Sequence, residues 1–473
     1  MKQKIKPSLS KGTRDFLPRE VAKRNYISDT IKTVFRNYGY EQIETPAIER
    51  LETLAGKYGD EGDKLLFKIL NSGDYLKEVP DEILTSRNSA QVTKYIAEKG
   101  LRYDLTVPLA RYVVQHQGKI AFPFKRFHIG PVWRADRPQK GRYQEFYQCD
   151  ADVIGSRWLW SEVELTHIFL DVFAALKIPV KVQINHRRIL YLIAKHYGYE
   201  NHFKEFSTII DKLDKIGYEG VVNELKRSGI SAVNVKESTD GNDLSHFREG
   251  LMSSHKSWKD LTLRLKDIFK DWQEEHKHID ELYHVTRNFE GNPLLVFNPY
   301  LARGLDYYTG IIWEVVIDKS DERCVNLSLG SIASGGRYDN LTEVFGGQNM
   351  SGVGISFGIE RIYDVMEELK LFPETIVQGV KVLFVPREPA VEEFTFKQVQ
   401  TLRNAGVSAE MFFNYVKKQK HYEYATAKGI SFIVEVGQDE KATGIFRVKD
   451  VSTQQEQRRS TQELIELLKE CNN

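Results

Sequence analysis

Residues 124–155 alternate polar and apolar side chains in a way that could build one polar face of a sheet. The pattern predicts two strands joined by a turn rich in arginine, proline, glutamine, lysine and glycine. Because residues two apart in a strand share a face, Arg134, Gln148 and Asp152 are expected on the same side. The turn adds further cations: Arg137, Lys140 and Arg142. Arginine forks bind phosphate bidentately and keep their charge, so the array suits a polyanion. For the second strand alone, an ordinary solvated face is an equally good interpretation.

Two further segments place an arginine beside glycines. Residues 303–310 read RGLDYYTG and precede an apolar strand expected at residues 311–317. An arginine at a strand start is more often a surface ion pair, but adjoining tyrosines and glycines favour a pocket. Residues 351–362 read SGVGISFGIERI, which predicts a strand that runs into a helix with Arg361 in its first turn. Most glycine runs are turns; here we interpret the glycines as room for a flat ring on which Arg361 stacks.

Other chemistries lack their motifs. The chain has no G-x-x-x-x-G-K-[ST], no G-x-G-x-x-G after a strand and no H-E-x-x-H, and its 12 histidines are scattered. No convincing Ser–His–Asp or Cys–His pattern occurs. The three cysteines, Cys149, Cys324 and Cys471, lie far apart. A disulfide framework, a cysteine-ligated zinc site or any other metal site of the protein's own is therefore not expected.

Composition excludes several classes of protein. The 473 residues are 41% hydrophobic and 28% charged, which is ordinary for a globular chain of about three domains. Lys plus Arg is 67 and Asp plus Glu is 66, so the net charge of +1 excludes a polybasic nucleic-acid binder but not a local basic patch. We find no apolar run of about 18 residues and no secretory signal peptide. The sparse thiols suit a reducing cytosol, so a cytoplasmic location is predicted.

Hydrophobic periodicity predicts the elements that position these residues. An amphipathic helix is expected at residues 18–38, followed by a short strand at 40–48 that Pro46 interrupts. The segment at about 181–288 is interpreted as an insertion that opens with a strand and is mostly helical and highly charged. Beyond a linker at 373–378, short β-rich runs alternate with helical stretches, which indicates a small α/β domain.

At this point the sequence resembles the histidyl-tRNA synthetase family of class II aminoacyl-tRNA synthetases. Motif 2 of that class resembles the segment FKRFHIGPVWRADRPQKGRYQEFYQCDADV, and motif 3 resembles GVGISFGIERI. The first helix together with YEQIETPAIE resembles motif 1. RGLDYYTG is similar to the histidine-specific motif, the opening KGTRDFLP is typical of the family, and VGQDEKATGIFRVKD resembles its anticodon-binding domain. The likeness covers nearly the whole chain, and it is weakest at about 60–100 and 217–288.

The resemblance implies an α+β fold: a class II catalytic domain with a central antiparallel sheet flanked by helices, an inserted helical domain and a C-terminal α/β anticodon-binding domain. The implied bounds are 1–375 for the catalytic domain, about 186–290 for its insertion and 379–473 for the last domain. The family's reaction joins histidine to its tRNA at the expense of ATP, with magnesium bound to ATP. A homodimer with motif 1 at its interface is also implied.

The same likeness implies roles for individual residues. Arg303 and Arg134 match catalytic arginines at the α-phosphate. Arg134, Arg142 and Arg361 match ATP-binding positions, and Lys140 is a weaker candidate beside them. The implied histidine-binding set is Asp104, Thr106, Gln148, Asp152, Arg303, Tyr307 and Tyr308. Arg137 and Gln139 match positions near the tRNA acceptor end. Candidate phosphate contacts in the last domain, each equally well explained as part of a solvated face, are Lys417, Lys418, Lys420, Arg447 and Lys449.

The sequence departs from the family pattern in places. Asp104 stands where many bacterial relatives have glutamate, and residues 149–152 resemble the eukaryotic form. The alternative hypothesis is a catalytically inactive paralogue, such as a regulatory subunit of ATP phosphoribosyltransferase. Such subunits typically lose the arginine of the histidine-specific motif and the last domain. Arg303 and the C-terminal domain therefore favour the enzyme.

Overall fold

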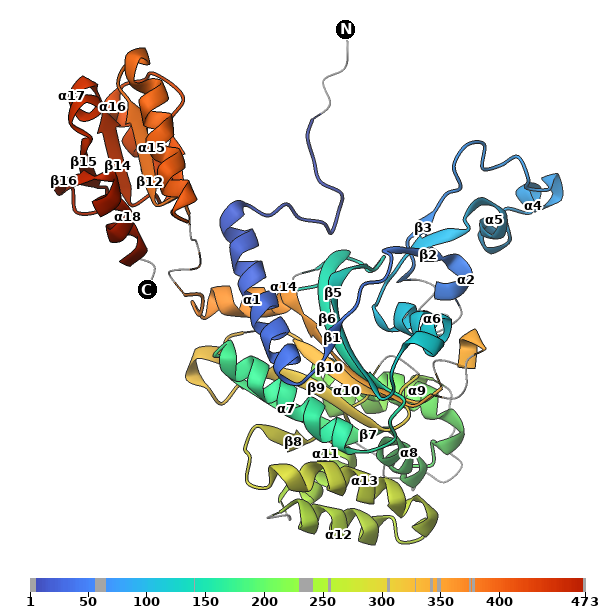
Figure 1. The fold of residues 1–473 in the computed structure, drawn as a ribbon. Helices are drawn as coiled ribbons and strands as arrows, with labels where there is room; N and C mark the ends of the chain where they lie inside the picture. Colours follow the sequence, from blue (N-terminus) through green and yellow to red (C-terminus); the bar gives the residue numbers. More distant parts are fainter. Residues whose placement is uncertain are drawn as a thin grey trace. The chain divides into compact units, whose positions relative to one another are not determined.

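The computed structural model describes the chain in two compact units, residues 1–372 and 373–473. The described residues are 6–55, 65–139, 141–228, 241–253, 257–303, 307–327, 329–340, 343–346, 350–373, 376 and 379–470. Lys140 and residues 304–306 of the RGLDYYTG segment, both singled out above, lie outside them. Each unit is treated separately below (Figure 1).

The first unit is built on an eight-stranded sheet with the order β1-β5-β6-β11-β10-β9-β7-β8. Its strands are β1 (Glu41–Gln42), β5 (Phe124–Trp133), β6 (Glu145–Ile154), β7 (Val180–His186), β8 (Leu295–Phe297), β9 (Ile311–Ile317), β10 (Ala333–Tyr338) and β11 (Gly352–Gly358). The six central strands pair antiparallel, as expected, whereas the edge strands β1 and β8 pair parallel with their neighbours. The sheet is therefore mixed, with an antiparallel centre.

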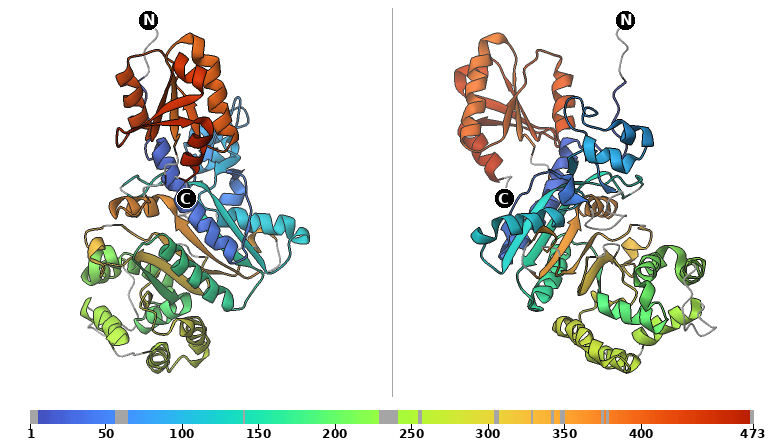
Figure 2. Two further views of the ribbon diagram at one scale, coloured as in Figure 1. Left: turned by 60° about the vertical axis from the view of Figure 1, so that its left-hand side comes forward. Right: turned by 90° about the vertical axis from the view of Figure 1, so that its right-hand side faces the viewer.

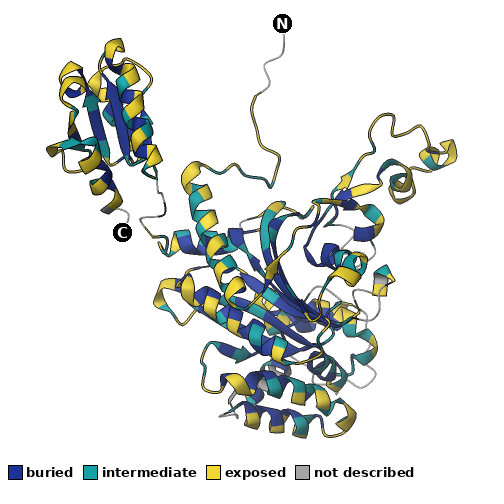
Figure 3. Cartoon of the chain, viewed as in Figure 1, coloured by how far each residue is buried: buried dark blue, intermediate teal, exposed yellow. Residues whose placement is uncertain are grey.

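Helices α1 (Pro18–Asn37) and α7 (Trp160–Ala175) cover the apolar face of this sheet (Figure 1). In α1 the buried residues recur at helical spacing, and the Phe35 ring lies 5.5 Å from that of Phe127 on β5. From α7, Phe169 packs 5.3 Å from Phe357 on β11. Figure 3 shows the resulting pattern, with buried strands beneath helices whose outer faces are exposed. The opposite sheet face is consequently left for polar side chains.

The helices between β7 and β8 share the core of the sheet. They are α8 (Arg187–His196), α9 (Phe203–Ile210), α10 (Leu213–Arg227), α11 (Gly241–Ser253), α12 (Trp258–Ile268) and α13 (His276–Thr286). Ile189 of α8, Leu265 of α12 and Val285 of α13 belong to the same hydrophobic cluster as Phe35 and Phe357. Gly217 interrupts α10 with a φ of 68°, which a residue with a side chain rarely adopts.

A small antiparallel sheet of order β2-β4-β3 lies beside the start of α6 (Thr106–His116). Its strands are β2 (Ile48–Arg50), β3 (Lys68–Ile69) and β4 (Lys99–Leu101), with short helices α2 (Leu51–Leu54), α4 (Asp81–Ser86) and α5 (Ser89–Ile96). The strand predicted over residues 40–48 is interrupted at Pro46 as expected, but its two parts, β1 and β2, belong to different sheets. The chain crosses between them at Pro46, and Arg102 binds the carbonyl oxygen of Thr45 at 2.6 Å.

The second unit is a five-stranded sheet of order β13-β12-β14-β15-β16 with helices on both faces (Figure 2). Its strands are β12 (Val382–Pro386), β13 (Ala409–Met411), β14 (Phe432–Val436), β15 (Ile445–Asp450) and β16 (Glu456–Ser460). Its helices are α15 (Glu392–Asn404), α16 (Lys418–Lys428), α17 (Gln438–Thr443) and α18 (Thr461–Glu470). Neighbouring residues of β12 point to opposite faces of this sheet and belong to separate hydrophobic clusters. Phe384 packs with residues of α15 and α18, whereas Leu383 packs with residues of α16. The α/β prediction is confirmed, but β16 is missed.

Candidate active site

A continuous row of polar residues crosses six strands of the first sheet on the face away from α1 and α7. Strand registers place these residues directly opposite one another, in the order His128, Asp150, Ser356, Ser334, Glu314 and Gln183. The neighbouring row is Arg126, Asp152, Gly354, Gly336 and Ile312. Because paired residues point to the same face, the two rows form one surface. The polar face expected for β5 and β6 thus extends to β7.

The Asp152 carboxylate is held deep in this face. It lies 2.6 Å from the guanidinium of Arg126, which is fully buried, and accepts a hydrogen bond from the Tyr338 hydroxyl. Glycine at position 354 is required here, because a Cβ there would lie 1.9 Å from the Asp152 Oδ1. Burial raises the pKa of Asp152, against the opposing effect of Arg126. The space above Gly354 is therefore used by a carboxylate and not left for a substrate ring.

Two tyrosines from residues 303–310 meet this carboxylate pocket. The Tyr308 ring lies on Gly336, whose Cβ would approach it to 2.5 Å. The Tyr307 hydroxyl donates to the Tyr308 hydroxyl at 3.3 Å, so the Tyr308 proton is left to donate elsewhere. Burial raises the pKa of Tyr308, and the Asp152 charge acts in the same direction. Tyr308 and Asp152 therefore share one buried site that offers both a donor and an acceptor.

Acidic groups concentrate around the same pocket. Burial, followed by the Asp152 charge, raises the pKa of Asp150 to about 7. Asp104, buried at the start of α6, adds to that effect and also to the raised pKa of Tyr307. Its Oδ1 accepts a hydrogen bond from the Val107 amide at 3.2 Å. This side of the site therefore favours a cationic or hydrogen-donating ligand.

Thr106 and Gln148 lie beside this acidic group. Thr106 is buried as the first residue of α6. The Gln148 amide donates to Ser356 Oγ at 2.8 Å, while its side-chain oxygen is buried and has no hydrogen-bond partner among the described residues.

Four arginines converge on the other end of the polar face. Burial lowers the pKa of Arg361, and the charges of Arg142, Arg134 and Arg303 lower it further. Arg303 donates to Ser334 Oγ at 2.8 Å and pairs with Glu314 at 3.2 Å. Burial acts to lower the pKa of Arg303, but the negative charge of Glu314, together with weaker effects of Tyr308 and Asp211, raises it overall. A cluster of positive charge of this kind is the electrostatic counterpart of a polyphosphate.

The remaining contacts show how these arginines are positioned. Arg134 donates through Nε to the Tyr103 carbonyl at 3.0 Å. Arg361, in the first turn of α14 (Ile359–Glu368), donates to the carbonyl oxygens of Gly141 (3.1 Å) and Ser331. Arg142 is exposed, 3.6 Å from Asp136. Its turn closes through a bridge to Gln139, and both Arg137 and Gln139 are exposed there.

Several residues of this site were not predicted from the sequence. They are Ser334, Glu314, Tyr338 and Ser356, whereas the strand alternation had already placed Arg126 and Asp150 on the polar face. Glu314 carried the clearest signal, as the one charged residue in the apolar run IIWEVVI. The others acquire their place only through strand pairing between distant segments.

The second unit carries a hollow of about 480 Å³ lined by aromatic and acidic side chains, among them Phe413, Tyr415 and Glu392. Phe413 is 75% exposed, which is unusual for a side chain of that size. Among the cations expected to contact phosphate, Lys418, Lys420, Arg447 and Lys449 lie within ion-pair distance of glutamates, while Lys417 is exposed. A stacking surface thus adjoins a set of cations.

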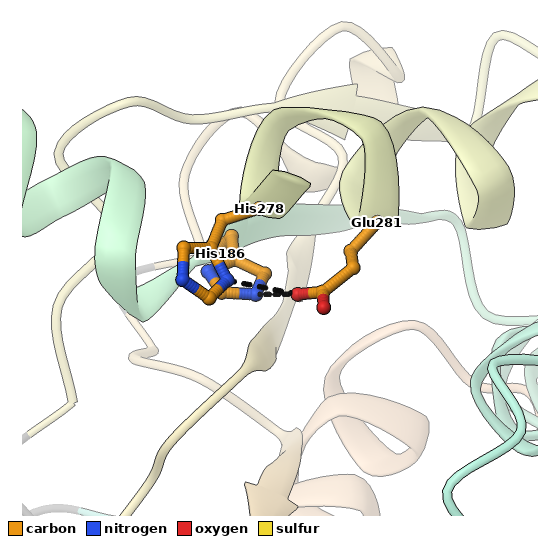
Figure 4. Close-up of side chains that lie close together, drawn as sticks. All are labelled: His186, His278 and Glu281. Atoms are coloured by element: carbon orange, nitrogen blue, oxygen red, sulfur yellow. Dashed lines mark hydrogen bonds and ion pairs between the residues drawn. The ribbon is translucent and has the colours of Figure 1, made fainter. Parts of the chain in front are cut away.

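His186, His278 and Glu281 form a cluster with metal-ligand chemistry (Figure 4). Both imidazoles point at one Glu281 oxygen, at 2.9 Å from His186 and 3.0 Å from His278. The Nδ1 of His186 accepts from the Arg188 amide at 3.1 Å, so its Nε2 carries the proton. A metal-ligating histidine donates through its second nitrogen instead. We therefore interpret the cluster as a hydrogen-bonded link between β7 and α13.

Comparisons with known proteins identify the family to which the chain belongs. A model of the histidyl-tRNA synthetase family matches residues 12–77 and 87–362, and a model of an anticodon-binding domain matches residues 381–471. The chain belongs to the histidyl-tRNA synthetase family. It is 45% identical to the histidine–tRNA ligase of Christiangramia forsetii, over 95% of this chain and 96% of that one. It is 46% identical to that of Bacteroides fragilis, over 97% and 98%.

Solved structures of the family share the fold. The histidyl-tRNA synthetase from Nostoc sp. PCC 7120 superimposes with a TM-score of 0.76 and 28% identity, over 99% of this chain and all of that one. A Bacillus halodurans structure is described as an ATP phosphoribosyltransferase regulatory subunit/histidyl-tRNA synthetase. It superimposes with a TM-score of 0.65 and 19% identity, over 92% of this chain and 99% of that one, and this likeness shows the fold alone. Among the described helices, none has the length and apolar character needed to cross a membrane.

Proposed function

We propose that the polar sheet face of this family member activates L-histidine with ATP and then transfers it to tRNA. The observation that carries the proposal is the division of that face into an acidic pocket at Asp152 and Tyr308 and a cluster of four arginines. In the first step a histidine carboxylate oxygen attacks the α-phosphorus. The bond to the β-phosphate breaks, and histidyl-adenylate and pyrophosphate form. In the second step a hydroxyl of the terminal adenosine attacks the acyl carbon, and AMP leaves.

The arginines supply the charge that the first step needs. Arg303 and Arg134 stabilise negative charge at the α-phosphate, where charge is greatest in the transition state. Arg142 binds the β- and γ-phosphates, and Arg361 binds the adenine and the γ-phosphate. Because Ser334 and Glu314 already hold the Arg303 guanidinium, little reorganisation is needed when the substrate arrives.

The acidic pocket selects histidine. A neutral imidazole has one donor and one acceptor nitrogen. Asp152 accepts from the first, and the Tyr308 proton, left free by Tyr307, is donated to the second. Asp104, Thr106 and Gln148 hold the α-ammonium group. An amino acid without the two nitrogens leaves these buried groups unpaired, which can reject it by a factor of about 10⁴.

The donors present fit magnesium carried by ATP. Magnesium is usually bound through phosphate oxygens and one or two carboxylates. Glu314 provides a carboxylate in electrostatic contact with both Arg303 and Arg361, and so near the phosphates. When bound, the ion neutralises charge on the leaving pyrophosphate.

The other parts of the chain serve tRNA and assembly. Arg137 and Gln139 contact the acceptor end, and the last domain binds anticodon bases by stacking on exposed rings such as Phe413. The proposed domains are residues 1–375, with an insertion at about 186–290, and 379–473. We also propose a cytoplasmic homodimer that uses motif 1.

Amino-acid-dependent exchange of pyrophosphate into ATP tests the proposal. The purified chain is assayed with magnesium and each of the twenty amino acids in turn. Exchange with histidine alone supports both the chemistry and the selection by Asp152 and Tyr308. Exchange with another amino acid refutes the selection, and no exchange from folded protein refutes the activity.

A further inference from the structure

The N-terminal turn at residues 10–16 contacts the loop that carries the phosphate-binding arginine Arg142. The Gly12 carbonyl accepts a hydrogen bond from the Gln144 amide at 2.9 Å. On its other side, the Gln144 carbonyl accepts from the Arg134 amide at 2.9 Å. The backbone of Gln144, where the loop leads back to the sheet, is thus hydrogen-bonded both to the N-terminal turn and to Arg134, the first residue after β5.

Close packing reinforces this hydrogen bond. Gly12 has a φ of +82°, and a Cβ there would lie 2.7 Å from Cγ of Gln144 and 2.9 Å from Cγ of Pro138. Only glycine allows both the backbone conformation and the close approach. The carbonyl of the preceding Ser10 accepts from the Thr13 amide at 3.2 Å, which fixes the turn itself.

Arg14 makes the second contact, on the neighbouring residue of the loop. Its guanidinium carbon lies 3.7 Å from the centre of the Tyr143 ring, and its Nη1 donates to the Tyr143 hydroxyl at 3.0 Å. That hydroxyl also donates to Asp364 at 3.3 Å, one helical turn beyond Arg361 on α14. Tyr143 is therefore fixed between the N-terminal turn and α14.

Arg142 lies between residues that are fixed on both sides. Gly141 is held by Arg361, and Tyr143 and Gln144 are held by Arg14 and Gly12. The Arg142 side chain itself is exposed, and its one ion pair within the described part of the chain is with Asp136 at 3.6 Å. Its direction is consequently set by its backbone, and the N-terminal turn supplies part of that restraint.

We propose that Gly12 and Arg14 are positioning residues for ATP, which act by holding the loop so that Arg142 meets the β- and γ-phosphates. This inference rests on the proposed function. None of residues 6–17 is buried, so the turn contributes little to the core. Its contacts with the loop are instead made to Tyr143 and Gln144, the two residues that directly follow Arg142.

Steady-state pyrophosphate exchange tests the inference with Gly12→Ala and Arg14→Ala. We expect the KM for ATP to rise on the order of tenfold in each, because small displacements of a binding group are costly. The KM for histidine and the melting temperature should stay close to those of the parent chain. Gly39→Ala is the matched control, because Gly39 has a similar φ of +79° but no atom within 4 Å of its Cβ position.

A double variant separates positioning from general damage. If Arg14 acts through Tyr143, Arg14→Ala combined with Tyr143→Ala should raise the KM for ATP no more than the worse single change. Additive effects of the two changes on the KM for ATP overturn the inference, and so does an unchanged KM for ATP in Arg14→Ala. In either case, histidine-dependent exchange by the parent chain still upholds the proposed function. Absence of exchange by the parent chain overturns both. Arg14→Ala introduces no backbone strain, so the test stands even if Gly12→Ala misfolds.

Discussion

Replacing Arg303 by alanine should abolish most of the activation chemistry while leaving the chain folded. The Arg303 side chain is 20% exposed, and its guanidinium is held by Glu314 and Ser334. Its loss removes one preorganised donor from the α-phosphate. Comparable donors and arginine fingers are worth about 10³-fold in rate. That factor corresponds to about 4 kcal/mol of transition-state stabilisation.

The same substitution has a smaller effect on folding. It leaves the Glu314 carboxylate, 23% exposed, without its cation, at a cost of about 1–3 kcal/mol. A chain stable by about 5–15 kcal/mol remains folded after such a loss. We therefore expect a melting temperature lowered by a few degrees.

Histidine-dependent pyrophosphate exchange, run beside thermal unfolding, separates the two effects. Arg303→Lys retains a positive charge but loses the two-pronged guanidinium, so its exchange rate should fall between those of the parent chain and Arg303→Ala. Arg323→Ala is the control, because Arg323 is an exposed arginine paired with Asp321 on a turn. An exchange rate of Arg303→Ala within tenfold of the parent would refute the role of Arg303.

Three further outcomes are expected. Tyr308→Phe removes only the hydroxyl that faces the imidazole. In the exchange assay it should therefore raise the KM for histidine by about 10- to 100-fold and leave the KM for ATP unchanged. Equal changes in the two KM values would contradict the assignment of Tyr308. Burial and Asp152 raise the pKa of Asp150 from 3.8 to about 7, so its contribution to stability is present below about pH 4 and lost as pH rises through 7. Asp150→Asn should therefore gain stability relative to the parent in urea unfolding as the pH rises from about 4 to about 7, with little further change above that, and a difference independent of pH would count against it. Phe413→Ala should raise the KM for tRNA in aminoacylation by about 5- to 100-fold without changing exchange, whereas Trp158→Ala, equally exposed in the first unit, should change neither.

Local patterns in the sequence were sufficient for the elements and for part of the site. Alternation in β5 and β6 placed Gln148 and Asp152 on one face, and the observed register confirms it. The glycine-bearing strand before Arg361 is β11, and the helix that follows is α14. These features depend on residues within one or two elements, so their spacing along the chain is informative.

The rest of the site depends on pairing between distant segments. Tyr338 binds Asp152 across 186 residues of sequence, and no local pattern connects the two. Ser334 and Glu314 become partners of Arg303 only because β9 and β10 pair in a particular register. Similarly, β16 is polar and lies at the sheet edge, so it lacks the apolar alternation by which the other strands were found.

The most direct test of the account is a single-turnover reaction of the chain with ATP labelled at the α-phosphate, excess histidine and magnesium, without tRNA. The account predicts a labelled histidyl-adenylate bound to the protein and released pyrophosphate, and addition of the cognate tRNA should then convert the adenylate to AMP and histidyl-tRNA. Release of labelled ADP, or no consumption of ATP by folded protein, would contradict the claim that this sheet face activates histidine.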